Sequence, residues 1–254
     1  MKYPSDLHDK EWDLISSNFT PKSKRGRPRK HSQKDIFNAI LYILKGGSTW
    51  RMMPNDLPPW QTVYDHFSRW SKNGVWELVL TQLNTLARNN AERNDPPSYG
   101  IIDAQSVKTQ YACEERGIDG GKKVKGHKRH ITVDTLGNLL HIHVHAANIS
   151  DTKAACEVFV RTSEKYPSIN AYSGDAGYRG TAVNFVKEQL NMTLHISTKI
   201  KDGWAVLPKR WIVERTFAWL NNFRRLAKDF EILPATSENM IRIAMIKITV
   251  AKCF

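Results

Sequence analysis

The hydrophobic pattern of this chain changes its period at a polar stretch, NNAERNDPPS, near residues 89–98. Before this stretch, apolar side chains recur every three or four residues, as on the segment that begins at Trp60, which is the spacing of one helix face. After it come short apolar runs typical of β-strands. We therefore predict a small all-α domain of helix-turn-helix type at residues 1–95 and an α/β domain at residues 96–254.

The individual elements follow from apolar spacing, capping residues and turn signals. In the first domain the expected helices cover residues 5–19 and 32–44, a segment from Trp60 and a segment after Gly74. In the second domain the expected strands cover residues 99–107, 129–135, 139–146, 169–174 and 193–198. The remaining expected helices cover residues 151–164, 181–189, 208–230 and 238–252. Three antiparallel strands followed by alternating helices and strands form a mixed α/β sheet.

The charge of the chain indicates an anionic partner, because the formal net charge is +13 and the isoelectric point is near 9.7. The basic residues gather in three clusters, which a generic basic protein does not need. These clusters are Lys22, Lys24, Arg25, Arg27, Arg29 and Lys30; Lys122, Lys123, Lys125, Lys128 and Arg129; and Lys209, Arg210, Arg215, Arg224, Arg225 and Lys228.

The sequence predicts a cytoplasmic protein with no membrane partner. No apolar stretch is long enough to cross a bilayer, and the N-terminal residues lack the apolar core of a signal peptide. The three cysteines, Cys113, Cys156 and Cys253, have no paired spacing, so we expect neither a disulfide framework nor a zinc knuckle.

Three carboxylates stand where the local sequence should hold them still: Asp103 in GIIDAQSVK, Asp175 in YSGDAGYRG and Glu214 in KRWIVERTFAWL. Side chains at strand ends of such sheets face the crevice where ligands bind. Helical spacing turns Glu214 away from the side expected to pack in the core. That core side holds Ile212, Trp219, Phe223, Leu226 and Phe230. Each acid alone also fits a strand end, a turn or a solvated helix face. Together they predict a magnesium site that faces a polyanion.

Two other features compete for attention. Asp134 lies at the expected hairpin turn, and local structure explains it adequately. His141, His143 and His145 alternate along one strand face. Successive residues on a flat strand rarely enclose zinc tetrahedrally, so a half-exposed edge strand explains these histidines better.

The three acids and the stretches around them resemble a known family. The chain is similar to bacterial insertion-sequence transposases of the DDE class, of the type of insertion-sequence families four and five, whose catalytic domain is RNase H-like. The similar stretches run through nearly the whole chain: RGRPRKH, AILYILKGGSTWRMMPNDLPPWQTVYDHFSRWSKNGVWE, IIDAQSVK, KGHKRHITVDTLGNLL, SGDAGYRG and RWIVERTFAWLNNFRRL. The family's motif of tyrosine, arginine, glutamate and lysine is matched at Arg210 and Glu214, whereas Leu207 and Asn221 stand at the tyrosine and lysine positions.

The resemblance implies a DNA transposase that binds the ends of an insertion sequence and catalyses strand cleavage and strand transfer. Asp103, Asp175 and Glu214 would be the catalytic residues and the ligands of two Mg²⁺ ions, with Mn²⁺ as a possible substitute. The expected partner is double-stranded DNA, both the terminal inverted repeats and the target. A homodimer in the DNA complex and association with the nucleoid follow from the same resemblance.

Candidate DNA-contacting residues come from several segments. The basic segment at residues 22–31 contains RGRPRK, which resembles an AT-hook core suited to a narrow minor groove, although a plain charged linker has the same composition. The helix from Trp60 could enter the major groove or only pack in a bundle. The loop GGKKVKGHKR should track phosphates. The candidates are Arg25, Arg27, Arg29, Lys30, Gln61, His66, Arg69, Lys122, Lys123, Lys125, Lys128, Arg129, Arg210, Arg224 and Arg225.

Two other functions stay open at this point. Another RNase H-like nuclease would share the acids but would not need a helical recognition domain. A non-catalytic DNA-binding protein derived from a transposase would have lost an acid; all three are present, but the departures at Leu207 and Asn221 keep this alternative open.

Overall fold

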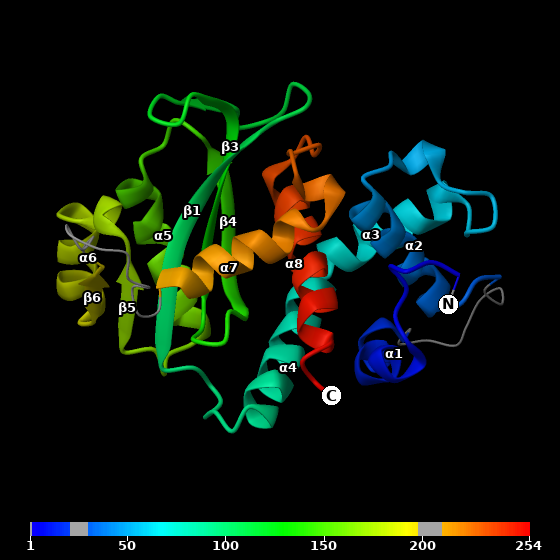
Figure 1. Ribbon diagram of the computed structural model, residues 1–254, viewed down its shortest axis with the longest axis horizontal. Helices are drawn as coiled ribbons and strands as arrows, with labels where there is room; N and C mark the ends of the chain where they lie inside the picture. The colour runs from blue at the N-terminus through cyan, green and yellow to red at the C-terminus, as the bar shows by residue number, and fades with distance from the viewer. Residues whose placement is uncertain (1, 21–29, 198–209) are drawn as a thin grey trace.

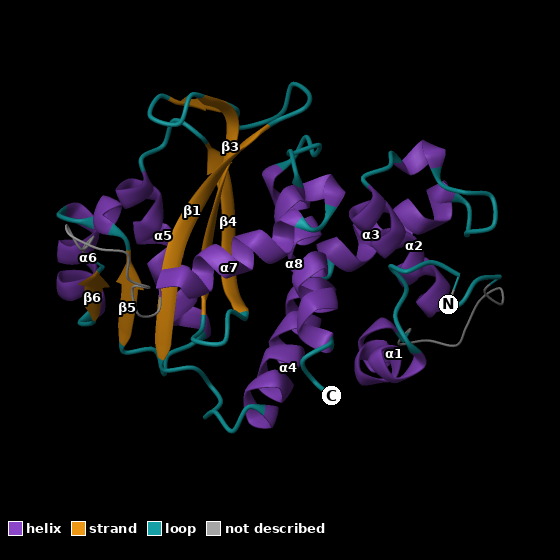
Figure 2. Ribbon diagram, viewed as in Figure 1, coloured by secondary structure: helices purple, strands orange, loops and turns teal. Residues whose placement is uncertain are grey.

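A six-stranded mixed sheet organises the second part of the chain (Figures 1 and 2). The computed structural model describes residues 2–20, 30–197 and 210–254. The strands are β1 (Tyr99–Lys108), β2 (Gly117–Asp119), β3 (Val124–Val133), β4 (Leu139–Ala146), β5 (Ala171–Gly174) and β6 (Thr193–Ile196). Their order is β2-β3-β1-β5-β6, and β4 pairs with β3. Strand β3 is antiparallel to both of its neighbours β1 and β4, whereas β5 runs parallel to β1 and β6 runs parallel to β5. The predicted mixed α/β sheet is confirmed.

Helices cover both faces of this sheet. They are α5 (Asp151–Lys165), α6 (Thr181–Leu190), α7 (Arg210–Asn221) and α8 (Pro234–Val250). Successive side chains of β1 point to opposite faces, so Ile101 and Ile102 belong to two different apolar clusters. Ile102 packs with residues of α5 and α6, and Ile101 packs with residues of α7 and α8.

The N-terminal part is helical, as predicted. It contains α1 (Asp9–Ile15), α2 (Gln33–Gly46), α3 (Trp60–Lys72) and α4 (Val75–Asn90), with short 3₁₀ turns η1 (Ser16–Phe19) and η2 (Trp50–Met52). The Ser32 hydroxyl accepts the Asp35 N–H and caps α2, and Gly47 ends this helix with φ 79°. An aromatic cluster around the fully buried Trp76 joins these helices.

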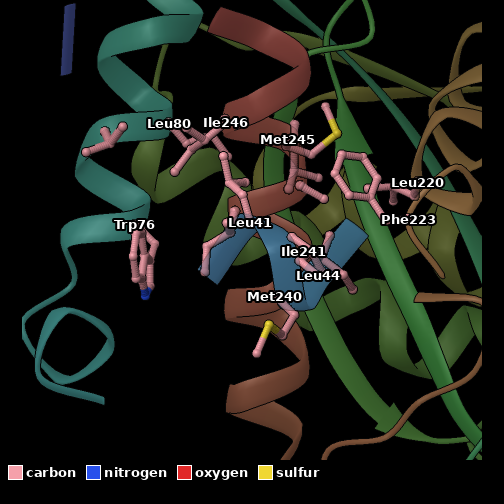
Figure 3. Close-up of a cluster of buried hydrophobic side chains, with 14 of the residues drawn as sticks. Leu41, Leu44, Trp76, Leu80, Leu220, Phe223, Met240, Ile241, Met245 and Ile246 are labelled. Atoms are coloured by element: carbon pink, nitrogen blue, oxygen red, sulfur yellow. The ribbon is translucent and has the colours of Figure 1, made fainter. Parts of the chain in front are cut away.

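The helical part and the sheet share one apolar core. Residues of α2 and α4 pack against the central α8, which in turn lies against β4 (Figure 3). The labelled members of this core are Leu41, Leu44, Trp76, Leu80, Leu220, Phe223, Met240, Ile241, Met245 and Ile246. A division of the chain at residues 95 and 96 therefore stays a prediction, because the core runs across it.

Several element boundaries differ from the predictions, and those of β3, α7 and α8 matter most for the site. Strand β3 begins at Val124 rather than residue 129, and the unpredicted β2 pairs with this added part. Gly126 permits this extension of β3 beside β1, since a Cβ at position 126 would lie 2.1 Å from the Val107 carbonyl oxygen. Helix α7 ends at Asn221, not at residue 230, and the chain turns through η4 (Arg224–Leu226). Helix α8 begins at Pro234, a residue favoured in a first helical turn, rather than at residue 238.

The hairpin acid Asp134 has a structural role. Its carboxylate is fully buried, lies 2.8 Å from the Arg88 guanidinium of α4, and accepts the backbone N–H groups of Leu136 and Asn138. A buried carboxylate needs such a counter-charge and such donors. Asp134 therefore fastens the β3–β4 hairpin to α4. The turn contacts agree with the prediction that local structure explains this acid, whereas the ion pair with Arg88 is a long-range contact that was not predicted.

Candidate active site

The register between β1 and β5 brings two of the predicted acids to one level of the sheet. These strands are parallel, and Ile101 lies opposite Ser173. Two residues further along, Asp103 of β1 and Asp175, which directly follows β5, reach the same level. Residues at one level of neighbouring strands point to the same face. The two carboxylates are therefore neighbours on one side of the sheet.

Helix α7 brings the third acid to the same face. Asp103 is the register partner of Ile131, which belongs to the apolar cluster beneath α7 and α8. The α7 residues Ile212 and Val213 are buried in that cluster, and the next residue, Glu214, is exposed. Figure 1 shows α7 passing across β1, and the two elements are in contact.

The electrostatics of Asp103 link it to the other two acids. The pKa of Asp103 is raised to about 6, mainly by burial and to a lesser extent by the negative charges of Asp175 and Glu214. The Ala104 N–H, which the carboxylate accepts at 2.7 Å, and the ammonium of Lys122 act in the opposite direction. Asp175 and Glu214 therefore lie within electrostatic range of Asp103.

The turn after β5 holds Asp175 in place. The Asp175 carboxylate accepts the Gly177 N–H at 2.8 Å and so caps the 3₁₀ turn η3 (Ala176–Tyr178). Gly174 allows the turn to fold tightly, because a Cβ there would lie 2.8 Å from the Tyr178 ring and 3.1 Å from Ile102. The small residues of the SGDAG stretch are thus required by close packing around this acid.

The donor set suits a hard divalent cation, although it does not form a closed ligand cage. Within residues 2–20, 30–197 and 210–254, no group of three His, Cys, Asp or Glu side chains is arranged to hold a metal ion. Carboxylates that share one face repel one another, and the raised pKa of Asp103 reflects its burial first and this repulsion second. A divalent cation would relieve it, and oxygen-only donors fit Mg²⁺ or Mn²⁺.

A basic pocket of about 440 Å³ begins two residues beyond Asp103 on β1. Its polar lining includes Gln105, Lys108, Asn221 and Lys228, and no acid lines it in the described part of the chain. Closer to the acids, the Lys122 ammonium lies 3.4 Å from the Ala104 carbonyl oxygen. Asn221, at the position of the family's lysine, therefore has Lys228 beside it in the pocket.

Three of the predicted DNA-contacting cations are buried in the fold, which corrects the prediction. The Arg129 guanidinium donates to the Leu226 carbonyl at 2.7 Å, and that of Arg225 lies 2.7 Å from Glu231. The Lys128 ammonium lies 2.8 Å from Asp151. Lys128 and Arg129 have internal partners because the basic run that reads as a loop is part of β3, whereas Arg225 lies in the buried part of η4 (Arg224–Leu226).

The other candidates differ in their surroundings. Those exposed at the surface are Lys30, Gln61, Arg69, Lys122, Lys123, Lys125 and Arg224. His66 is half-buried on α3, where its Nδ1–H donates to the Thr62 carbonyl at 2.8 Å. Those that lie outside the described residues are Arg25, Arg27, Arg29 and Leu207, together with the side chain of Arg210.

Sequence reasoning missed an aromatic and cationic surface on α7. The Arg215 guanidinium lies 4.4 Å from the Trp211 ring and 4.5 Å from the Trp219 ring, and Lys252 covers Trp219 at 4.6 Å. We predicted Trp219 in the core, which was wrong: it is only half-buried and lines a surface pocket. The four-residue spacing of the three side chains, which places them on one helix side, was the available signal.

Comparison with known proteins identifies two matching families. Residues 7–80 match the family described as "Putative transposase of IS4/5 family", and residues 94–247 match "Transposase DDE domain". The chain is also 26% identical over 118 residues to an uncharacterized protein, y4sN, of Sinorhizobium fredii (strain NBRC 101917 / NGR234). That match covers 46% of this chain and 87% of the relative.

Solved structures of a transposase are weakly similar. The Mos1 transposase paired-end complex with left transposon end has a TM-score of 0.26 at 12% identity, covering 92% of this chain and 81% of that chain. The Mos1 strand transfer complex has a TM-score of 0.27 at 12% identity, covering 95% and 83%. Structural similarity this weak supports no conclusion about this chain, so its assignment to a family rests on the two family matches.

Among the helices formed by residues 2–20, 30–197 and 210–254, none is long and apolar enough to span a bilayer.

Neutralising Asp103 should stabilise the metal-free protein. The folded-state pKa of about 6 lies above the ordinary value of 3.8, so ionised Asp103 disfavours the folded state once the pH exceeds both values. We expect Asp103→Asn to raise the free energy of unfolding by about 1–3 kcal/mol at pH 8 in EDTA, measured by urea denaturation.

The gain in the free energy of unfolding should shrink as the pH falls from 6 towards 4, where Asp103 becomes protonated in both the folded and the unfolded state. The exposed Asp13→Asn is the matched control and should change stability by less than about 0.5 kcal/mol. A variant Asp103→Asn that is less stable than the parent at pH 8 would contradict the strained carboxylate cluster.

Proposed function

The chain belongs to the DDE transposase family, and we propose that this DNA transposase cleaves the ends of an insertion sequence and joins them to target DNA at the site of Asp103, Asp175 and Glu214. The observation that carries the residue assignment is the coupling of these three acids on the α7 face of the sheet. The alternatives of another RNase H-like nuclease and of a non-catalytic DNA-binding protein derived from a transposase are not favoured, because both family matches are to transposases.

The family implies a divalent metal, and the three acids are the residues that would hold it. Bound there, two Mg²⁺ ions would supply Lewis acidity for an attacking oxygen and for the leaving 3′-oxygen. The proposal is supported by the β1–β5 register, which brings Asp103 and Asp175 to one level, and by the contact of α7, which carries Glu214, with β1. Rigid elements of this kind keep reacting groups in the orientation that phosphoryl transfer requires.

The cations around the acids would hold the DNA strand. Lys122 lies against the Ala104 carbonyl, next to Asp103, where it can contact the phosphate that reacts. The pocket with Lys108 and Lys228 lies further along β1 and can take a neighbouring phosphate of the same strand. These lysines would supply the positive charge that the family's motif places at the position of Asn221.

The helical region would recognise the ends of the element. Gln61 and Arg69 are exposed on α3, whose opposite side packs through Val63 and Phe67. A helix held in this way can offer polar side chains to the major groove. Joining two ends to one target requires two active sites, so a homodimer in the DNA complex is part of the proposal.

Removal of any one acid should abolish the chemistry but not DNA binding. We expect Asp103→Asn, Asp175→Asn and Glu214→Gln each to lower the rate of Mg²⁺-dependent nicking and strand transfer at least about 10²-fold. The substrate is a supercoiled plasmid that carries the element's ends. Binding to the same ends in EDTA, measured by gel shift, should stay within a few-fold of the parent.

The matched control is Glu188→Gln, an exposed acid on α6, which should keep the parental rate. Nicking at the parental rate by any of the three variants would refute the assignment of that acid.

Neutralising the two pocket lysines should weaken DNA binding in a salt-dependent way. We expect the double variant Lys108→Gln and Lys228→Gln to reduce the slope of log affinity against log salt concentration by about 2, one for each lost phosphate contact. The control Lys187→Gln removes an exposed charge from α6, on the other side of the sheet, and should leave the slope unchanged. Equal slopes for the double variant and the control would show that the pocket does not contact DNA.

A further inference from the structure

A chain of buried hydrogen bonds runs behind the three acids. The Tyr178 hydroxyl lies 2.8 Å from Nε2 of His130, whose Nδ1 lies 3.4 Å from Nε2 of His145. The Nδ1 of His145 lies 3.0 Å from the carbonyl oxygen of Ala146. The three side chains are almost completely inaccessible, at 1%, 0% and 1% exposure for Tyr178, His130 and His145. The edge strand β4 was expected to leave its histidines half-exposed, but His145 faces inward to take part in this chain.

The chain has one consistent direction. The Ala146 carbonyl can only accept, so Nδ1 of His145 carries a proton and its Nε2 accepts from Nδ1–H of His130. Nε2 of His130 is then an acceptor and takes the Tyr178 O–H. Burial lowers the pKa of both histidines and raises that of Tyr178, so all three groups are neutral at physiological pH.

Tyr178 is also fixed to the turn that carries Asp175. It is the last residue of η3, and its backbone N–H donates to the Asp175 carbonyl at 3.2 Å. Its ring packs so closely against Gly174 that a Cβ there would come within 2.8 Å of it. The turn is therefore fixed at its start by β5 and at its end by the Tyr178 hydroxyl.

We propose that Tyr178 and His130 are positioning residues, which hold the η3 turn so that the Asp175 carboxylate stays beside Asp103. The inference rests on the proposed function, because it assigns a role in the same reaction. His145 completes the chain by fixing which nitrogen of His130 accepts. Displacement of a reacting group by a fraction of an ångström lowers the rate of chemistry while substrate binding is unaffected.

The chain offers a matched pair of tyrosines for the test. Tyr172 is fully buried on β5, and its hydroxyl lies 2.7 Å from the Ser163 Oγ of α5. This contact does not involve the turn that carries Asp175. Tyr178→Phe and Tyr172→Phe each delete one buried hydroxyl contact. We expect Tyr178→Phe to lower kcat for cleavage about tenfold with KM for DNA unchanged, and Tyr172→Phe to change neither. The inference is overturned if Tyr178→Phe keeps kcat within twofold of the parent or if both variants lose the same amount.

A conservative substitution separates positioning from general packing. Gln at position 130 can place its amide oxygen where Nε2 accepts the Tyr178 hydroxyl, whereas Leu cannot. We expect His130→Gln to keep kcat within about threefold of the parent and His130→Leu to fall as far as Tyr178→Phe. Equal loss in the two His130 variants would contradict the proposed role.

A readout that does not depend on catalysis tests the same inference. Hydrogen exchange of the Gly177 amide, which donates to Asp175, should be at least about tenfold faster in Tyr178→Phe and unchanged in Tyr172→Phe. If the parent protein cleaved no DNA while this difference in exchange was present, the proposed function would fail and the positioning contact would stand. If the exchange rates of the two variants were the same, the positioning role would be refuted whatever the activity.

Discussion

The parallel pairing of β1 with β5 is the constraint on which the proposed site depends. It places Asp103 and Asp175 at one level and on one face of the sheet, although 71 residues separate them in sequence. A shift of the pairing by one residue would turn one of the two carboxylates to the opposite face. Bulky side chains on both faces oppose such a shift, because Ile101 and Ile102 are each buried in a separate cluster. The packing that stabilises the sheet therefore also determines the geometry of the acids.

Charge is used in two different ways in this molecule. Away from the site, buried charges are compensated: Arg88 neutralises Asp134, and Asp229 lies 2.9 Å from the imidazole of His127. At the site, negative charge accumulates, and the pKa of Asp103 rises to about 6. Uncompensated negative charge lowers the stability of the folded state, and such an arrangement is expected where a cation is to bind. Basic side chains that could have neutralised the acids lie instead along the proposed path of DNA, as Lys108 and Lys228 do.

Much of this architecture could be predicted from the sequence because it depends on local patterns. Alternating apolar residues predicted the strands, and turn residues around Asp175 predicted a sharply bent acid-bearing segment. The assignment of Asp103, Asp175 and Glu214 to one metal site stays a prediction. The long-range burial of several cations was not anticipated. Arg129 and Arg225 resemble surface cations in sequence, and only the packing of η4 against β3 and α2 reveals their internal partners.

The errors on α7 and β4 have the same origin. The expected core stripe extended through Phe230, but the helix ends at Asn221, so Trp219 is left at the surface with Arg215. On β4 the alternation correctly placed His143 and His145 on one face, yet not the inward contact of His145 with His130, which lies 15 residues earlier in the chain. Such contacts depend on which strands pair, and single-strand periodicity does not contain that information.

The convergence of the three acids on a shared metal is best tested by affinity cleavage. Fe²⁺ bound in place of Mg²⁺, with ascorbate and peroxide, generates hydroxyl radicals that cut the nearby polypeptide backbone. The account predicts cleavage near residues 103, 175 and 214 together, suppressed by excess Mg²⁺ and lost in the variant Glu214→Gln. Cleavage at only one of the three segments, or at sites unrelated to them, would contradict it.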